Sequence, residues 1–247
     1  GETIYLTHPT GEIIEKIDVP SLHNNETYGK LVSKKSYSIM RPTPGIKNAI
    51  KNSPPEFSKP SGFYQDDFDL ELSSKENNVI YYTTDGSDPL DSNNTKIYKE
   101  PILIYDRSSE PNIYSEYDSS DPTSPLCITT PPYNGQKGYQ KPNYLVDKAM
   151  IIRAVIKSED GFSDTIDKTY FVTNKDLYKY LDYKIISIVS NPKNLFDADT
   201  GIYVLGNEYF EWRNNNEGVN MWGGTRGHFF NKGKEWERQS SISIFEN

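Results

Sequence analysis

The sequence predicts a mainly β protein, in which a β-sandwich is flanked by a partial N-terminal β domain and a C-terminal mixed α/β fragment. Short runs of β-branched and aromatic residues recur along the 247 residues, separated by Gly, Pro, Asn and Asp turn signals. The 19 tyrosines and 10 phenylalanines supply large side chains for a sandwich core, although only 34% of the residues are hydrophobic. A chain of this length can bury such a core without disulfides or metals.

The composition excludes several classes of function. The formal net charge of -8 argues against nucleic acid and against an anionic membrane as the partner, because both select basic patches. Cys127 is the single cysteine, which excludes an internal disulfide framework and a cysteine metal cluster. No apolar run approaches the roughly 18 residues of a membrane span, so membrane insertion is not expected. We also expect no cofactor.

The stretch from Val79 to Pro89 joins a strand to a sharp turn. Its first six residues are β-branched or aromatic, the types that suit a half-buried pleated surface. Asp85 and Gly86 then supply the positive φ of a tight turn, and Asp88 and Pro89 keep the departing chain extended. These four turn residues are therefore predicted to be structural.

The same stretch carries a family resemblance. Residues 81–89, followed by Tyr98 and by Pro101 to Ile104, resemble the chitobiase/β-hexosaminidase C-terminal domain, a small immunoglobulin-like sandwich found as an accessory module. The resemblance implies an immunoglobulin-like sandwich over residues 54–173.

Alternating residues support this sandwich. From Phe68 to Leu72, apolar and acidic residues alternate with period two, which places Phe68, Leu70 and Leu72 toward a core. The other strands of the sandwich are expected at 102–105, 150–156 and 165–172.

The N-terminal residues 2–19 read as a hairpin. Its first strand, its Gly11 turn, the Tyr28-Gly29 pair and the run from Arg41 to Gly45 together resemble the C-terminal half of a bacterial lamin-tail domain, another immunoglobulin-like fold. We therefore expect a partial lamin-tail-like domain over 1–45. The polar segment 46–53 is predicted to be a semi-rigid linker.

Residues 106–148 form a segment rich in Ser, Pro, Tyr, Asp and Asn that is too long for a simple connection. Its pieces at 106–108, 110–112, 131–132 and 146–149 resemble the version of this module that precedes CotH-type domains. We therefore predict an ordered insertion that packs against the C-terminal part and covers the apolar strand at 185–189.

The C-terminal part begins with a predicted helix, which Asn174 caps and which ends near Leu181. A strand at 185–189, a helical turn at 191–196 and a strand at 201–204 follow. The motifs at 191–204 and 229–238 resemble the opening of the CotH family, named for spore coat protein H, whose members resemble secreted atypical protein kinases. The resemblance implies that 174–247 are the N-terminal part of a CotH-like domain, without the residues that hold nucleotide and magnesium in that family.

No catalytic residue is predicted. Gly223 to Gly227 lack the Lys-Ser/Thr pair and the helix of a phosphate-binding loop, so we interpret them as a flexible loop. Asp197, Asp199 and Glu208 have the spacing of positions 1, 3 and 12 of an EF-hand, but Ile202 stands where the sharp turn of that loop needs glycine. We interpret these carboxylates as turn caps, with a metal site as the alternative.

The predicted function is that of a non-catalytic accessory or scaffold region of a secreted or cell-surface CotH-like protein. Such a region orients the downstream domain and contacts surface partners. We expect the chain to be a fragment, since it starts at Gly1 in what reads as a strand and no signal peptide precedes it. Its expected partners are other domains of the same protein and a cell-surface or spore-surface protein or glycan. The alternative is a carbohydrate-binding module, in which Trp212, Trp222 and Trp236 stack on sugar rings.

Overall fold

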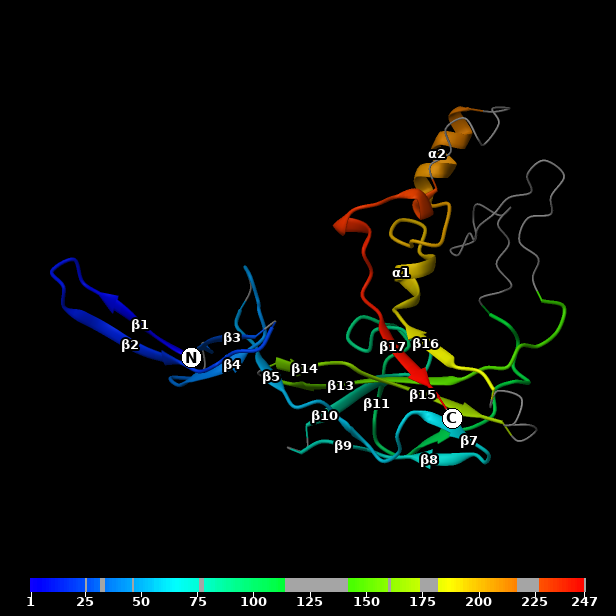
Figure 1. The fold of residues 1–247 in the computed structure, drawn as a ribbon, viewed down its shortest axis with the longest axis horizontal. Coiled ribbons are helices and arrows are strands. Elements are labelled where there is room, and N and C mark those ends of the chain that lie inside the picture. Colours follow the sequence, from blue (N-terminus) through cyan, green and yellow to red (C-terminus); the bar gives the residue numbers. More distant parts are fainter. Residues whose placement is uncertain are drawn as a thin grey trace.

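The computed structural model is mainly β, as the sequence predicts, and α-helix is limited to two short segments in the part of the chain that it describes (Figure 1). The described residues are 1–24, 26–31, 34–45, 47–75, 78–113, 142–159, 161–173, 182–216 and 227–246.

The largest sheet is centred on β13 (Met150–Ser158). This strand pairs antiparallel with β10 (Val79–Thr83) on one side and with β15 (Ile166–Val172) on the other. β10 also pairs with β11 (Lys96–Ile97), and β15 runs parallel to β7 (Gly62–Tyr64). The three long strands coincide with the β-branched and aromatic runs of the sequence, so the central part of the predicted sandwich is present.

A single apolar core joins this sheet to four shorter strands. β8 (Phe68–Leu70) pairs with β12 (Ile102–Ile104), and β9 (Leu72–Ser73) pairs with β6 (Glu56–Phe57). The predicted alternation is confirmed, because Leu70 and Leu72 are buried while the intervening acidic side chains are exposed. The core consists of Leu70, Leu72, Ile80, Ile102, Ile104, Met150, Ile152, Ala154, Ile156, Tyr170 and Val172.

The N-terminal hairpin pairs β1 (Glu2–Thr7) with β2 (Ile13–Val19), as predicted, and projects away from the sandwich (Figure 1). Next in the chain come β3 (Thr27–Lys30) and β4 (Tyr37–Met40), which also pair antiparallel.

The segment 46–53, which the sequence predicts to be a linker, contains the strand β5 (Ile50–Asn52). β5 pairs antiparallel with β4 and parallel with β14 (Gly161–Ser163), which in turn pairs with the end of β13. β3 and β4 are therefore joined to the large sheet by backbone hydrogen bonds. The polar sequence of β5 gave no strand signal, because its pairing depends on β14, more than a hundred residues further along the chain.

The C-terminal part contains the two-stranded sheet of β16 (Ile185–Val189) and β17 (Ser241–Phe245), with α1 (Pro192–Phe196) and α2 (Asn207–Asn215) between them in sequence. α1 is the predicted helical turn, and the side chain of Asn191 caps it by accepting a hydrogen bond of 3.1 Å from the Lys193 amide. The helix predicted from Asn174 lies outside the described residues. None of the helices in the described ranges is long and apolar enough to cross a membrane.

The predicted strand at 201–204 is wrong. The amides of Ile202 and Tyr203 donate hydrogen bonds of 3.0 and 2.8 Å to the carbonyl oxygens of Asn194 and Leu195. The chain therefore folds back on α1 in a series of turns and does not enter a ladder. Val204 is fully buried in this turn, so its apolar character reflects packing and not strand pairing.

Candidate functional site

The turn after β10 is held by side chains of its own residues. Gly86 has φ of 80°, in the left-handed region that the Asp85-Gly86 pair was expected to supply. Asp85 Oδ1 accepts a hydrogen bond of 3.0 Å from the Ser87 amide, and Asp88 Oδ1 accepts one of 2.9 Å from the Leu90 amide. Both aspartates therefore cap the turn, and Pro89 is buried beneath it.

The carboxyl group of Asp85 is fully engaged inside the turn. Partial burial raises the pKa of Asp85, but the hydrogen bonds from Ser87 and Asn94 outweigh burial and leave the pKa below its usual value. The side-chain Nδ2 of Asn94 donates a hydrogen bond of 2.7 Å to Asp85 Oδ2. This carboxylate is a structural acceptor, which agrees with the interpretation of the turn as structural.

Asn112 joins the two ends of the insertion to each other, and we call these two ends the neck of the insertion. This side chain is only 7% exposed, and its amide nitrogen donates a hydrogen bond of 2.8 Å to the Tyr144 carbonyl oxygen. Its amide oxygen accepts one of 3.2 Å from the Val146 amide. One buried side chain therefore fixes both ends of the insertion to each other. Five tyrosines of the insertion were expected to pack against the C-terminal part. Tyr144 is exposed, and the tyrosines 114, 117, 133 and 139 lie outside the described residues.

Glu110 is the second point of closure. Its carboxylate accepts hydrogen bonds of 2.9 and 2.7 Å from Arg107 and one of 2.7 Å from the Tyr105 hydroxyl. The Arg107 hydrogen bonds are the main reason that the pKa of Glu110 lies below its usual value. The Lys148 ammonium donates hydrogen bonds of 2.8 and 2.9 Å to the carbonyl oxygens of Glu110 and Val146. Lys148 therefore provides a second connection between the two ends of the insertion.

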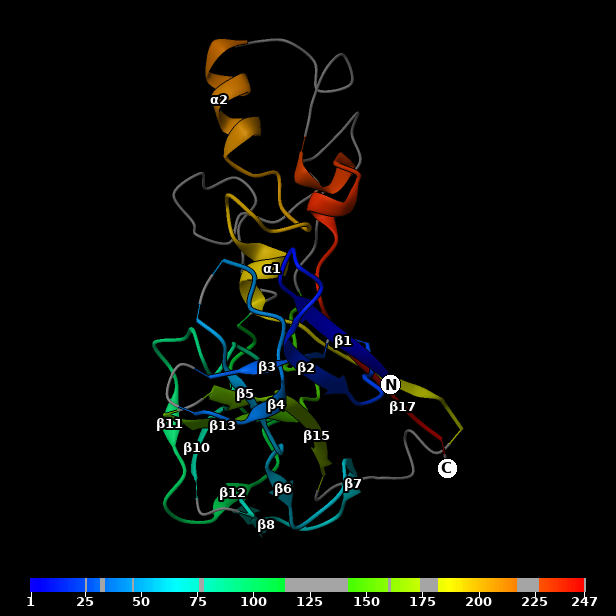
Figure 2. The ribbon, with the colours of Figure 1, turned by 90° about the vertical axis from the view of Figure 1, so that its left-hand side faces the viewer.

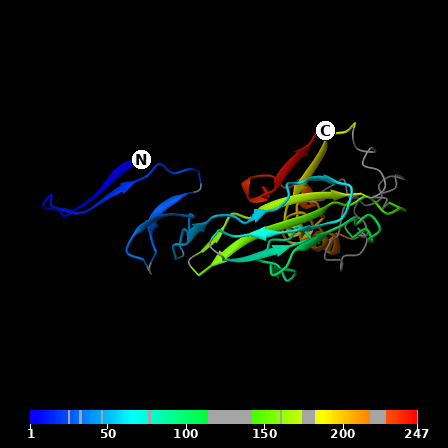
Figure 3. The ribbon, with the colours of Figure 1, turned by 90° about the horizontal axis from the view of Figure 1, so that it is seen from below.

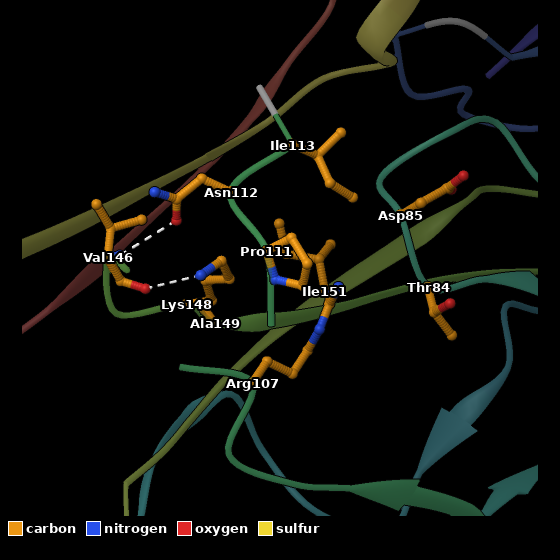
Figure 4. Close-up of a pocket in the computed structure, with 10 residues that line it drawn as sticks. All are labelled: Thr84, Asp85, Arg107, Pro111, Asn112, Ile113, Val146, Lys148, Ala149 and Ile151. Atoms are coloured by element: carbon orange, nitrogen blue, oxygen red, sulfur yellow. Dashed lines mark hydrogen bonds between the residues drawn. The ribbon is translucent and has the colours of Figure 1, made fainter. Parts of the chain in front are cut away.

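A cavity of about 400 Å³ lies beside this neck. Figure 4 shows the neck residues Pro111 and Ile113 on one side of it and the turn residues Thr84 and Asp85 on the other. Its walls are mostly aliphatic, and the charged groups that reach it, such as Arg107, are hydrogen-bonded to other residues of the chain. The cavity has the size of a small-ligand pocket, but no set of side chains in it forms a catalytic arrangement.

A nearly buried ion pair connects the Gly86 turn to the C-terminal sheet. Arg153 Nε donates a hydrogen bond of 2.7 Å to Asp167 Oδ1, and the two side chains are only 14% and 10% exposed. Arg153 Nη1 also donates one of 2.9 Å to the Gly86 carbonyl oxygen. The other oxygen of Asp167 accepts a hydrogen bond of 2.6 Å from the Ser241 hydroxyl in β17. The network therefore joins four elements: the turn after β10, β13, β15 and β17.

Two further contacts fix the β16–β17 sheet on the outer face of β15. The hydroxyl groups of Thr169 and Ser187 lie 2.8 Å apart, and both residues are buried. The ring of Phe171 meets the edge of Phe245 with centroids 5.3 Å apart, and Phe63 stacks on Phe171 at 4.7 Å. The expected interface between the sandwich and the C-terminal part is thus present, and it is made by direct packing of the two sheets.

Two of the three metal candidates, Asp197 and Asp199, accept hydrogen bonds from other residues of the chain. Asp197 Oδ1 accepts hydrogen bonds from the amides of Asp199 and Thr200 at 2.9 and 3.0 Å, and Asp199 Oδ1 accepts one of 2.6 Å from the Asn207 side chain. Glu208 is exposed in the first turn of α2. Over the described ranges, no group of three or more His, Cys, Asp or Glu residues is arranged to hold a metal ion.

The two tryptophans in the described ranges are each packed against neighbours within the chain. Trp236 is half-buried between His228, whose ring centroid is 4.8 Å away, and the Arg238 guanidinium, 5.2 Å from the Trp236 ring centroid. Trp212 is also half-buried, and its ring lies 6.3 Å from that of Tyr209. Trp222 lies outside the described residues. The two described tryptophans are therefore engaged by neighbours in the same chain.

These features define a β-sandwich module with a further small sheet fixed to its outer face. Comparison with known proteins agrees for part of it: residues 59–110 match the family model of the chitobiase/beta-hexosaminidase C-terminal domain. The match includes the Gly86 turn and the strands around it, on which the resemblance was first noted. Neither the curated proteins nor the solved structures contain a match to the chain. The resemblances of 1–45 to lamin-tail domains and of 174–247 to CotH proteins stay predictions.

The sequence analysis did not predict the roles of Arg153 and Asp167 at the junction or of Asn112 at the neck of the insertion. Arg153 stands alone as a charged residue in the otherwise apolar first part of β13, which was a usable signal for a buried ion pair. Its partner Asp167 and the bridging Asn112 gave no comparable signal, because their contacts are 14 and 34 residues away in the sequence.

Proposed function

We propose that this chain is a non-catalytic accessory region that holds a neighbouring domain in a fixed orientation. The observation that carries the proposal is the junction between the sandwich and the β16–β17 sheet. It combines the hydrogen bond from Ser241 to the nearly buried Asp167 carboxylate, a buried hydroxyl pair and an aromatic contact, and such a combination restrains the C-terminal sheet in one orientation. A scaffold that orients another domain needs this kind of rigid attachment.

The proposal extends to the protein class that the sequence motifs suggest. We propose that residues 174–247 belong to a CotH-like domain, that residues 1–45 are lamin-tail-like, and that the region is secreted or displayed at a cell or spore surface. The motifs at 191–204 and 229–238 support the CotH-like part of this proposal, and the motifs of residues 1–45 support the lamin-tail-like part. The accessory region itself neither binds nor hydrolyses ATP.

Two measurements test the accessory role. Calorimetry with ATP and magnesium is expected to show no binding, whereas micromolar affinity would overturn the non-catalytic reading. Limited proteolysis is expected to leave the sandwich and the β16–β17 sheet in one fragment, because their contacts are buried. Separation of the two parts on a sizing column after mild cleavage would show that the junction does not orient anything.

A glycan-binding role is a second candidate, supported by a polar cleft and not by the tryptophans. The cleft has a volume of about 740 Å³ and is lined by residues from the turn after β10, from β13, β14, β15 and α1, and from the approach to β17, among them Asp88, Asn194, Glu237, Gln239 and Ser240. Amide, carboxylate and hydroxyl groups of this kind hydrogen-bond to sugar hydroxyls. Binding to a glycan array that Glu237→Ala and Gln239→Ala abolish would support it, and an array without signal would remove it.

A further inference from the structure

The β16–β17 sheet exposes an aliphatic face to solvent. An antiparallel sheet that covers a core normally points its apolar side chains inward and its polar ones to solvent. Here the inward residues are mixed and include Ser187 and Ser243 as well as Val189 and Phe245, whereas Ile186, Ile188, Ile242 and Ile244 point outward. These four isoleucines are 58%, 63%, 63% and 61% exposed. We call them the isoleucine face. The expectation that the insertion covers this strand stays a prediction, because residues 114–141 of the insertion lie outside the described residues.

The isoleucine face is regular. Its side chains form two cross-strand pairs, Ile186 with Ile244 and Ile188 with Ile242. The next pair along the ladder is Lys184 with Glu246, whose charged groups lie 2.7 Å apart on the same side of the sheet. Figure 3 shows β17 on one flank of the molecule, clear of the strands of the sandwich. The face is therefore flat, aliphatic and bounded at one end by one positive and one negative charge.

We propose that the isoleucine face is a self-association surface, covered in solution by the same face of a second copy of this chain. A two-fold axis parallel to the strands places β16 of one copy over β17 of the other. Each isoleucine pair then meets the equivalent pair, and Lys184 of one copy lies opposite Glu246 of the other. The contact is isologous, and both the aliphatic part and the charged end are complementary to themselves.

Other occupants fit the face less well. A membrane surface is disfavoured by the formal charge of -8, and a sugar would find neither an aromatic ring nor a hydrogen-bonding side chain among the four isoleucines. Four half-exposed side chains per copy are a small contact, below the roughly 1,200 Å² in total that stable complexes bury. The dimer is therefore weak and reversible, which suits a surface that engages when many copies are displayed side by side.

Sedimentation equilibrium of the full chain tests the proposal. Over concentrations from about 5 µM to about 500 µM, we expect a reversible monomer–dimer equilibrium. Ile188→Lys is expected to raise the dissociation constant at least tenfold, because it places two like charges in the contact. Ile14→Lys is the matched control, since Ile14 is 60% exposed on β2, and it is expected to leave the equilibrium unchanged. Unchanged melting midpoints in both variants show that folding is not the cause.

A charge exchange tests the orientation of the two copies. Lys184→Glu alone and Glu246→Lys alone place like charges opposite each other in the dimer, so each variant is expected to associate more weakly than the original chain. Mixing the two variants restores opposite charges in both contacts between positions 184 and 246 and is expected to recover a heterodimer. A chain that stays monomeric at every concentration overturns the proposal, as does a dimer that Ile188→Lys does not weaken.

Discussion

The two-stranded sheets β1–β2 and β16–β17 have similar antiparallel ladders but different attachments. Every residue of β1 is exposed, and the attachment of β2 to the neighbouring strands includes Glu15, which accepts hydrogen bonds of 2.8 Å from Lys30 and 3.0 Å from Tyr37. In β16, by contrast, alternate residues are buried against the sandwich, and Figure 2 shows β17 beside the body of the molecule.

The difference shows where the stability of a two-stranded sheet comes from. A hairpin alone is marginally stable in water, so its persistence depends on packing against another layer. β16–β17 has such a layer in β15, whereas the side chains of β1–β2 face mainly solvent. We therefore expect β16–β17 to unfold together with the sandwich and β1–β2 to open independently of it.

The largest effect is expected from Arg153→Ala. The substitution leaves the Asp167 carboxylate nearly buried without its cation, which costs about 3–5 kcal/mol of unfolding free energy. Denaturant titration measures the loss, and hydrogen exchange is expected to show β17 opening first. The double variant Arg153→Met with Asp167→Leu is the control and should lose less, because it removes both charges. If Arg153→Ala were as stable as the original chain, the ion pair would not hold the C-terminal sheet.

The next effect is expected from Gly86→Val. A β-branched residue is strained at φ of 80°, and this strain costs roughly 1–3 kcal/mol of unfolding free energy. There is room for the side chain, because the nearest atom to an added Cβ is the Ser190 carbonyl oxygen at 3.8 Å. The melting midpoint is expected to fall.

Gly86→Asn separates strain from side-chain volume, because asparagine tolerates the left-handed region. It should therefore lose clearly less stability than Gly86→Val. Equal losses in the two variants would assign the effect to contacts with the Ser190 region and not to φ.

A smaller, pH-dependent effect is expected at the neck of the insertion. Because the pKa of Glu110 is lowered in the folded chain, its contribution is complete above the unfolded pKa of about 4.3 and is lost as the pH falls through the folded value. The contribution is about 1 kcal/mol or less, since the pair with Arg107 is partly exposed.

Glu110→Gln is expected to weaken the neck at neutral pH and to remove this part of the pH dependence. Hydrogen exchange at the Val146 amide, compared between pH 7 and pH 3, is the measurement. Identical exchange in the variant and the original chain at both pH values would show that Asn112 and Lys148 close the neck without Glu110.

The smallest effect is expected from removal of residues 1–20, which deletes the β1–β2 hairpin. The denaturation midpoint of the sandwich should stay the same, because no residue of the hairpin belongs to the main core. A clear drop in the midpoint would mean that the hairpin is as firmly attached as β16–β17.

Local signals in the sequence were sufficient for most of the strands. Alternation from Phe68 to Leu72 and the β-branched run before Gly86 placed β8, β9 and β10, because period-two burial and turn chemistry are local properties. The same reasoning failed at Gly201 to Val204, where a short apolar run is buried in a turn against α1. A short β-branched run is compatible both with a strand in a sheet and with a turn packed against a helix, so the run alone does not distinguish the two structures.

Local sequence patterns could not predict the contacts between distant segments of the chain. The polarity of β16 predicted burial of all its isoleucines, but which face meets the sandwich is decided by Thr169 and Phe171 on β15. Likewise, the Arg153 to Gly86 hydrogen bond joins residues 67 positions apart. Such contacts follow from the arrangement of the sheets in space and not from any local pattern.

The closure of the insertion by Asn112 affects how this protein can change over evolutionary time. Because Asn112 fixes Tyr144 and Val146, the sandwich meets the same two ends whatever sequence runs between them. Doubling the length of the intervening segment changes the loop-closure free energy by only about 0.6 kcal/mol. The neck is therefore a natural grafting point, at which related proteins can exchange one surface segment for another while the core strands stay untouched.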